Sequence, residues 1–145
     1  MDWKREAADK LRCFEAKQGS IERAGAELRR LEKEAYAIRG AGIDRAPVRG
    51  GGNRREDAMI NNIMRREELR RAIEDTSCWV SIVAGALEVL SNDERLILDR
   101  FYMHRAKGNV EKLCGELHLE KTRVYELREA ALRRFTYALY GVLET

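Results

Sequence analysis

Residues 109–135 read NVEKLCGELHLEKTRVYELREAALRRF, and this stretch decides the fold of the chain. Its first half carries an apolar face at the helical spacing i, i+3, i+4 and i+7, made of Val110, Leu113, Cys114 and Leu117. Its second half carries a longer apolar face, made of Val124, Leu127, Ala131 and Phe135. Only His118, Leu119 and Glu120 separate the two helices that these patterns predict, so we expect the helices to cross sharply with their apolar faces in contact.

Two helices joined in this way form a helix-turn-helix, which usually lays its second helix in the major groove of DNA. The alternative is an ordinary pair of packed helices in an all-α domain. The three-residue turn and the charged outer face of the second helix favour DNA binding.

The second helix presents polar side chains opposite its apolar face, and Lys121 lies at its start. We predict that seven of its residues contact DNA, namely Lys121, Thr122, Arg123, Tyr125, Glu126, Glu129 and Arg133. An ion pair between Glu129 and Arg133, four residues apart on the helix surface, is the alternative for those two.

The chemistry of the first turns suits base edges and phosphates. Lys121 and Arg123 can contact phosphate or guanine, and Thr122 can contact phosphate or a thymine methyl group. Glu126 can accept a hydrogen bond from cytosine N4, and Tyr125 can bond phosphate or pack on sugar.

The composition indicates an all-α protein. Among 145 residues there is one Pro, 37% of the residues are charged and 44% are apolar, which suits amphipathic helices. The formal net charge is +3, and residues 39–71 carry nine basic and five acidic side chains. The positive excess therefore lies outside the helix-turn-helix, which argues against strong non-specific DNA binding by that module alone.

The rest of the chain predicts a long antiparallel hairpin that resembles a coiled coil. Apolar residues recur with a heptad period over 7–38 and again over 59–90, and the Gly-rich segment 39–53 between them predicts a flexible basic loop. We therefore expect two domains, a helical hairpin over 1–90 and a trihelical DNA-binding domain over 91–145.

Three helices are expected in the second domain, over 92–104, 110–117 and 121–143. Ser91 and Glu94 form a capping-box motif at the start of the first of them.

Several function classes are excluded or disfavoured by the sequence. Cys13, Cys78 and Cys114 are odd in number and far apart, so neither disulfides nor a zinc site is expected. No catalytic motif surrounds a Ser or Cys, and His104 and His118 lack carboxylate or thiol neighbours at ligand spacing. We expect no enzymatic activity, no cofactor, no leader and no membrane span, and a cytoplasmic location.

The residues 90–102, LSNDERLILDRFY, followed by 110–135, resemble region 4 of bacterial sigma factors. In that family an acidic capped helix precedes a helix-turn-helix with an Ala-Leu-Arg-Lys-Leu-like tail, here 131–135. A coiled-coil half before such a module is similar to small phage-encoded late transcription regulators of the ArpU/RinA type.

The resemblance implies specific binding to a promoter-like or operator element in double-stranded DNA. The positions matching the family's base-reading residues are Lys121, Thr122, Tyr125 and Glu126. His118 stands where many such turns have Gly, and Tyr125 and Glu126 replace more usual Arg and Gln types, so the family pattern does not specify the DNA sequence read. Contact with RNA polymerase is implied by analogy.

The expected function is therefore a phage or prophage transcriptional regulator. A DNA-packaging role like that of a terminase small subunit, or a helical structural or adaptor role, is the alternative. Whether the hairpin closes within one chain or pairs two chains into a homo-oligomer is left open by the sequence.

Overall fold

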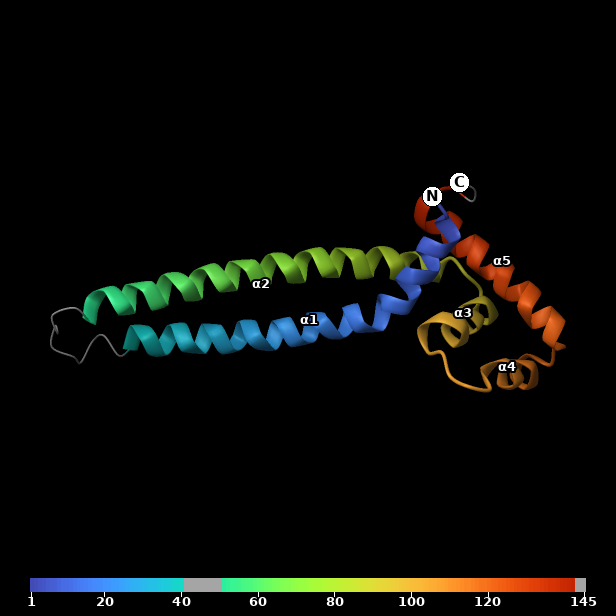
Figure 1. Cartoon of the computed structure of the whole chain (residues 1–145), viewed down its shortest axis with the longest axis horizontal. Coiled ribbons are helices and arrows are strands. Elements are labelled where there is room, and N and C mark those ends of the chain that lie inside the picture. The colour runs from blue at the N-terminus through green and yellow to red at the C-terminus, as the bar shows by residue number, and fades with distance from the viewer. Residues whose placement is uncertain (41–50, 143–145) are drawn as a thin grey trace. The chain divides into compact units, whose positions relative to one another are not determined.

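The structure is a computed structural model that describes residues 1–40 and 51–142 (Figure 1). It confirms the predicted all-α class, because the described residues form a long antiparallel hairpin followed by three shorter helices packed together. The elements are α1 (Trp3–Gly40), α2 (Gly51–Glu88), α3 (Asn92–Leu98), the π-helical turn η1 (Asp99–Met103), α4 (Asn109–Leu117) and α5 (Lys121–Tyr140).

The described residues divide into two compact units. Residues 19–77 form one unit, and residues 1–18 together with 78–142 form the other. The domain boundary predicted after residue 90 falls inside the unit formed by residues 1–18 and 78–142.

The unit formed by 19–77 is the distal part of the α1–α2 hairpin. Leu31 and Ala35 are buried on the α1 side, and Asn62 is buried on the α2 side. An ion pair joins Glu32 to Arg70 across the helices, with 3.7 Å between Oε1 and Nη2. The predicted loop 39–53 is shorter than expected at both ends, since α1 continues to Gly40 and α2 begins at Gly51. Its residues 41–50 lie outside the described part of the chain.

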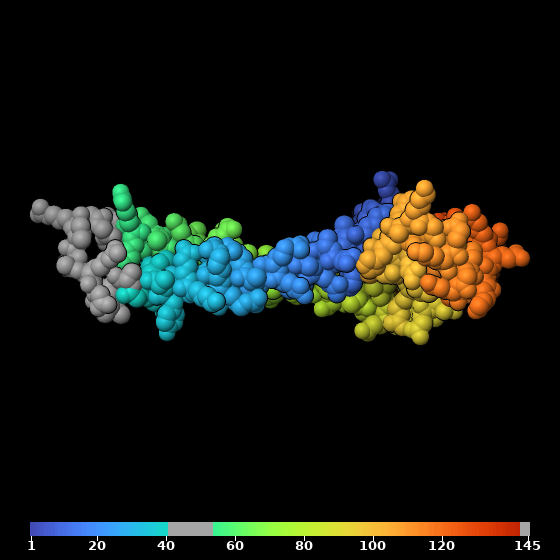
Figure 2. All heavy atoms as spheres, turned by 90° about the horizontal axis from the view of Figure 1, so that it is seen from below, coloured from blue at the N-terminus to red at the C-terminus, as the bar shows by residue number. Residues whose placement is uncertain are grey.

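The other unit has a core built from both ends of the described chain. Leu11 and Phe14 of α1, Val83 and Leu90 around the end of α2, and Phe135 of α5 belong to one buried cluster. Each large apolar side chain fully buried in this way stabilises the fold by roughly 1.5–3 kcal/mol. At the surface of the same unit the Trp3 and Tyr140 rings lie with centroids 4.8 Å apart. Figure 2 shows the blue start of α1 beside the orange residues of the C-terminal helices.

The start of α3 forms as the sequence predicts. Ser91 Oγ accepts a hydrogen bond from the Glu94 N–H at 3.2 Å, and Glu94 Oε1 accepts one from the Ser91 N–H at 3.1 Å, which completes the capping box. The helix predicted over 92–104 differs in one respect, because its second half is the π-helical turn η1. There the His104 N–H reaches the Asp99 carbonyl oxygen at 2.6 Å.

Candidate nucleic-acid interface

The turn between α4 and α5 is short and tightly bonded. His118 ends α4 with φ 55° and ψ 45°, the left-handed region that only a minority of non-glycine residues adopt. The N–H groups of His118 and Leu119 both bond to the Cys114 carbonyl oxygen. Because the chain reverses within these residues, α5 begins at Lys121 after a turn of the length the sequence predicts.

The predicted contact between the two apolar faces holds for the first part of α5 only. Ile97, Leu113 and Val124 are fully buried together, and Leu127 packs against them. Ala131 and Phe135 instead join the core that includes Leu11 and Val83. The apolar face of α5 therefore contacts α3 and α4 over its first two turns, and the ends of the hairpin beyond them.

The five predicted residues at the start of α5 lie together at the surface. Val124 is 0% exposed, and the five exposed residues around it are Lys121, Thr122, Arg123, Tyr125 and Glu126. Within the described chain, Lys121 and Thr122 make no side-chain hydrogen bond or ion pair, whereas Arg123 Nη1 lies 3.1 Å from Glu126 Oε2. Such an exposed pair contributes about 0–1 kcal/mol, so a phosphate or base edge can displace it.

The other two predicted residues are also exposed and lie further along α5. Glu129 contacts Lys4 Nζ at 3.8 Å and Arg128 Nη2 at 3.0 Å, so its partners lie on α1 and on its own helix. The pairing of Glu129 with Arg133 that the sequence left open is not among the ion pairs of the described residues. Arg133 borders a shallow apolar groove beside Val89 and Tyr137. At about 1.5 Å of rise per residue, Arg133 lies roughly 18 Å along the axis from Lys121.

A basic groove that the sequence did not predict adjoins the start of α5. It has a volume of about 740 Å³ and is lined by α1, η1, the residues up to α4, the first turn of α4, and α5. Its charged lining consists of the five basic residues Arg12, Arg100, Arg105, Lys107 and Arg128 and the single acidic residue Glu111. Tyr125 belongs both to this lining and to the exposed group at the start of α5.

Aromatic rings fix two of the groove's arginines. The Arg128 guanidinium carbon lies 5.1 Å from the Phe101 ring centroid and 5.2 Å from that of Tyr125. The Arg12 guanidinium lies 5.3 Å from the Tyr102 centroid. Burial raises the pKa of the Tyr102 phenol, which therefore stays neutral beside these cations.

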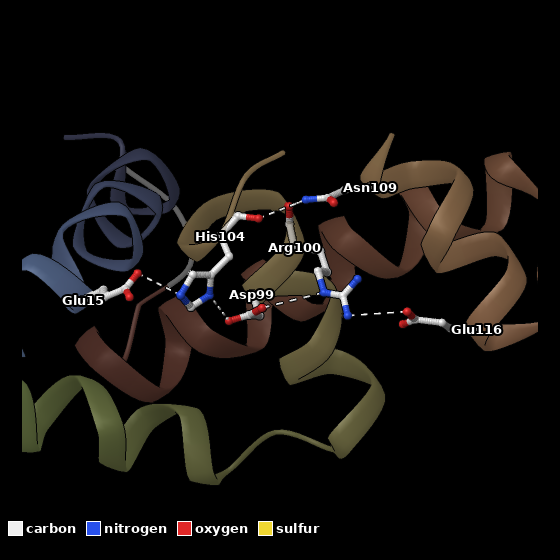
Figure 3. Close-up of polar contacts among 6 residues, drawn as sticks. All are labelled: Glu15, Asp99, Arg100, His104, Asn109 and Glu116. Carbon is white, nitrogen blue, oxygen red and sulfur yellow. Dashed lines mark hydrogen bonds and ion pairs between the residues drawn. The ribbon is translucent and has the colours of Figure 1, made fainter. Parts of the chain in front are cut away.

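A polar network holds the segment between η1 and α4 (Figure 3). Asn109 Nδ2 donates to the carbonyl oxygens of Arg100, at 2.8 Å, and His104, at 3.0 Å, and its side chain is largely buried. Gly108, with φ 82°, occupies the N-cap position of α4 just before Asn109. Arg100 in turn contacts Glu116 of α4 at 3.4 Å.

His104 is the titratable centre of this network. Its Nδ1 lies 2.7 Å from Asp99 Oδ1 and its Nε2 lies 2.8 Å from Glu15 Oε2. The hydrogen bond to Asp99 raises the pKa of His104, and the charges of Asp99 and Glu15 act in the same direction. The sequence does not place these carboxylates at ligand spacing, because Glu15 is distant in sequence and Asp99 is brought near by the π-helical turn.

The described residues contain no group of three His, Cys, Asp or Glu side chains arranged to hold a metal ion. All three cysteines, which lie within this part of the chain, are free thiols. No described helix is long and apolar enough to cross a membrane. Comparisons of the chain with protein-family models, with curated proteins and with solved structures found no match.

Proposed function

We propose that the protein is a sequence-specific DNA-binding transcriptional regulator, encoded by a phage or prophage, that reads a promoter-like or operator element. In this proposal the first two turns of α5 enter the major groove, and the module acts like region 4 of a sigma factor. Lys121, Thr122 and Arg123 lead the helix into the groove, and Tyr125 and Glu126 follow one turn later.

One observation carries the proposal. Five side chains able to contact base edges or phosphates surround the buried Val124 at the exposed start of α5. Val124 anchors this turn against Ile97 and Leu113, so the exposed side chains project from a fixed backbone. Exposed polar side chains on a fixed backbone at the start of a second helix are what direct readout of base pairs requires.

The test begins with the full chain and selection of bound fragments from a pool of genomic DNA. A duplex selected in this way is then titrated against Lys121→Ala combined with Arg123→Ala. Removal of contacts worth about 1–3 kcal/mol each should weaken binding to this duplex at least tenfold and reduce its preference over a scrambled duplex.

The matched control is Arg29→Ala combined with Lys33→Ala, which removes the same charge from an exposed face of α1. It should leave the sequence preference unchanged. Full binding by the α5 double variant, with an unchanged circular-dichroism spectrum, would overturn the assignment of α5 as the reading helix.

Two further measurements separate the proposed regulator from the packaging alternative. For a regulator, sedimentation should show a monomer or a small homo-oligomer. A packaging protein would instead form a ring of many subunits. Transcription with purified RNA polymerase from the selected fragment should change when the protein is added. A many-membered ring without an effect on transcription would favour packaging.

A further inference from the structure

We propose that the basic groove beside α4 is a phosphate-binding site for the sugar–phosphate backbone of the duplex that α5 reads. This rests on the proposed function and deepens it. The basic groove would bind the phosphates of one DNA strand at the edge of the major groove that α5 enters. These contacts would fix the register of α5 on the base pairs. Arg105 and Lys107 carry the proposal, and Arg128 and Tyr125 belong to the same lining.

The groove carries positive charge that the protein does not compensate. Five basic side chains and one carboxylate line the groove, and the ion pairs of the described residues neutralise only some of them. Arg12 pairs with Asp9, Arg100 with Asp99 and Glu116, and Arg128 with Glu129. Arg105 and Lys107 have no such partner among the described residues, and both are exposed. The groove therefore has two charges available to an anion.

The backbone of the groove is preorganised. The segment carrying Arg105 and Lys107 is fixed at one end by His104, held between Asp99 and Glu15, and at the other by Asn109. Rotamer entropy is lost on binding only by the side chains of Arg105 and Lys107, because the backbone between them is already positioned.

Hydrogen-bond donors without a side-chain acceptor belong to the lining of the groove. Gly108 precedes α4 and has no side chain to cap this nine-residue helix, and Gly108, Asn109 and Val110 line the groove. Arg128, which lines the groove as well, has its Nε buried without a hydrogen-bond partner among the described residues. Both features favour an oxygen-rich anion in the groove.

Tyr125 connects the groove to the reading helix. Tyr125 lies in the groove lining and one turn beyond Lys121 and Thr122, so a DNA strand that contacts the start of α5 would pass the opening of the groove. The phosphates of this strand are therefore the anions that we assign to the groove.

The experiment is a salt titration of duplex binding by the full chain. The variant is Arg105→Ala combined with Lys107→Ala, since both side chains are exposed and neither contributes to the core. Removing one phosphate-binding cation should lower the magnitude of the slope of log K against log salt by about 0.9, so a drop of about 1.8 is expected for the pair. Affinity should fall for selected and scrambled duplexes alike, leaving their ratio unchanged.

A second arm locates the phosphates and distinguishes their source. Duplexes with one neutral methylphosphonate each are scanned across the flank of the selected site. One to three positions should weaken wild-type binding and have no further effect on the double variant. Inorganic phosphate and ATP are titrated separately, and binding of ATP that the double variant abolishes, without any methylphosphonate effect, would overturn the backbone assignment.

The outcomes separate this proposal from the proposed function. If the wild type binds duplex DNA with the expected weakening in the α5 double variant, but the salt slope of Arg105→Ala with Lys107→Ala is unchanged, only the groove proposal fails. If the wild type binds no duplex at any salt concentration, the proposed function fails and the groove proposal with it.

Discussion

Asn62 donates its side-chain amide to the backbone carbonyl oxygen of Leu31 across the hairpin, with 2.8 Å between Nδ2 and O. Its other side-chain atom, Oδ1, accepts a hydrogen bond from Arg66 Nε at 2.8 Å. Asn62 is 4% exposed, so this is a buried polar contact whose donor and acceptor are both satisfied. Such a contact favours one register of α1 on α2, because a shifted pairing would leave the amide unpaired.

The replacement Asn62→Asp should destabilise the hairpin markedly. A carboxylate cannot donate to the Leu31 carbonyl, and it would be buried facing that oxygen, at a cost of about 2–4 kcal/mol of unfolding free energy. The neighbour Asn61 is exposed, so Asn61→Asp is the control and should change stability by less than about 0.5 kcal/mol. Urea unfolding of the three proteins measures both; equal effects would contradict a buried role for Asn62.

Removal of the cap on α3 should have a moderate effect. Ser91→Ala removes the side-chain acceptor for the Glu94 N–H and should lower the unfolding free energy by about 1 kcal/mol. Ser81→Ala, at an exposed position inside α2, removes no cap and should leave stability the same or slightly higher. Thermal unfolding followed by circular dichroism compares the two, and an unchanged melting temperature in Ser91→Ala would argue against the cap.

Protonation of His104 should stabilise the protein at low pH. Because its pKa is raised in the folded state, the stabilisation is fully present below about pH 6.5 and is lost as pH rises through the raised pKa. His104→Gln should therefore melt at a lower temperature than wild type in mildly acidic buffer, with the difference shrinking at alkaline pH. NMR titration measures the pKa of His104, whose imidazole resonance is assigned by its absence in His104→Gln. This pKa should be lower in Asp99→Asn than in wild type, because the hydrogen bond to the carboxylate is lost. No fall would mean that Asp99 does not cause the shift.

The turn between α4 and α5 should tolerate glycine and resist branched side chains. His118 has a positive φ, which costs an L-residue other than Gly roughly 1 kcal/mol or more. His118→Gly should keep the stability of wild type or raise it slightly, whereas His118→Val should lower the unfolding free energy by about 1 kcal/mol. Chemical denaturation measures the order of the three proteins, and Val more stable than Gly would exclude the left-handed turn.

A fragment of residues 91–145 should not fold cooperatively on its own. It lacks Leu11, Phe14 and Val83, which complete the buried cluster around Phe135. Calorimetry should show a broad, weak transition for the fragment and a sharp one for the full chain. A sharp transition in the fragment would show that α3 to α5 are self-sufficient.

The helices of the C-terminal part could be predicted because their signals are local. The apolar periods over 109–135 and the Ser91–Glu94 pair depend only on residues within one or two helical turns. The π-helical turn η1 was missed, since no local motif distinguishes Asp99–Met103 from an ordinary α-helix.

The hairpin shows why an apolar pattern alone misplaces residues. Ile63 belongs to the apolar period over 59–90, yet its side chain is 38% exposed, whereas the adjacent Asn62 is buried. The opposing helix determines which residues of α2 are buried. Asn62 can be buried because the backbone carbonyl oxygen of Leu31 accepts a hydrogen bond from its side chain. A pattern of apolar residues in one helix contains no information about that partner.

The candidate interface was predictable only where it lies on one helix. Lys121 to Glu126 follow from the helical wheel of α5, whereas Arg12 reaches the basic groove from the other end of the chain. The contact of Glu129 with Lys4 could not be predicted, because it depends on how α1 packs, which the spacing of charges does not reveal. Non-local packing is therefore the information missing from the sequence.

The joining of both chain ends in one core has a consequence for the order of events during synthesis. A ribosome releases Leu11 and Phe14 long before Phe135, so these side chains remain without their final partners while most of the chain is made. The pairing of 19–40 with 51–77 needs only residues already outside the ribosome, and it can close first. Early closure of the hairpin would bring Leu11 and Phe14 close in space to the end of α2 before α5 is made. The chain segment that must close when α5 packs against them would then be effectively shorter.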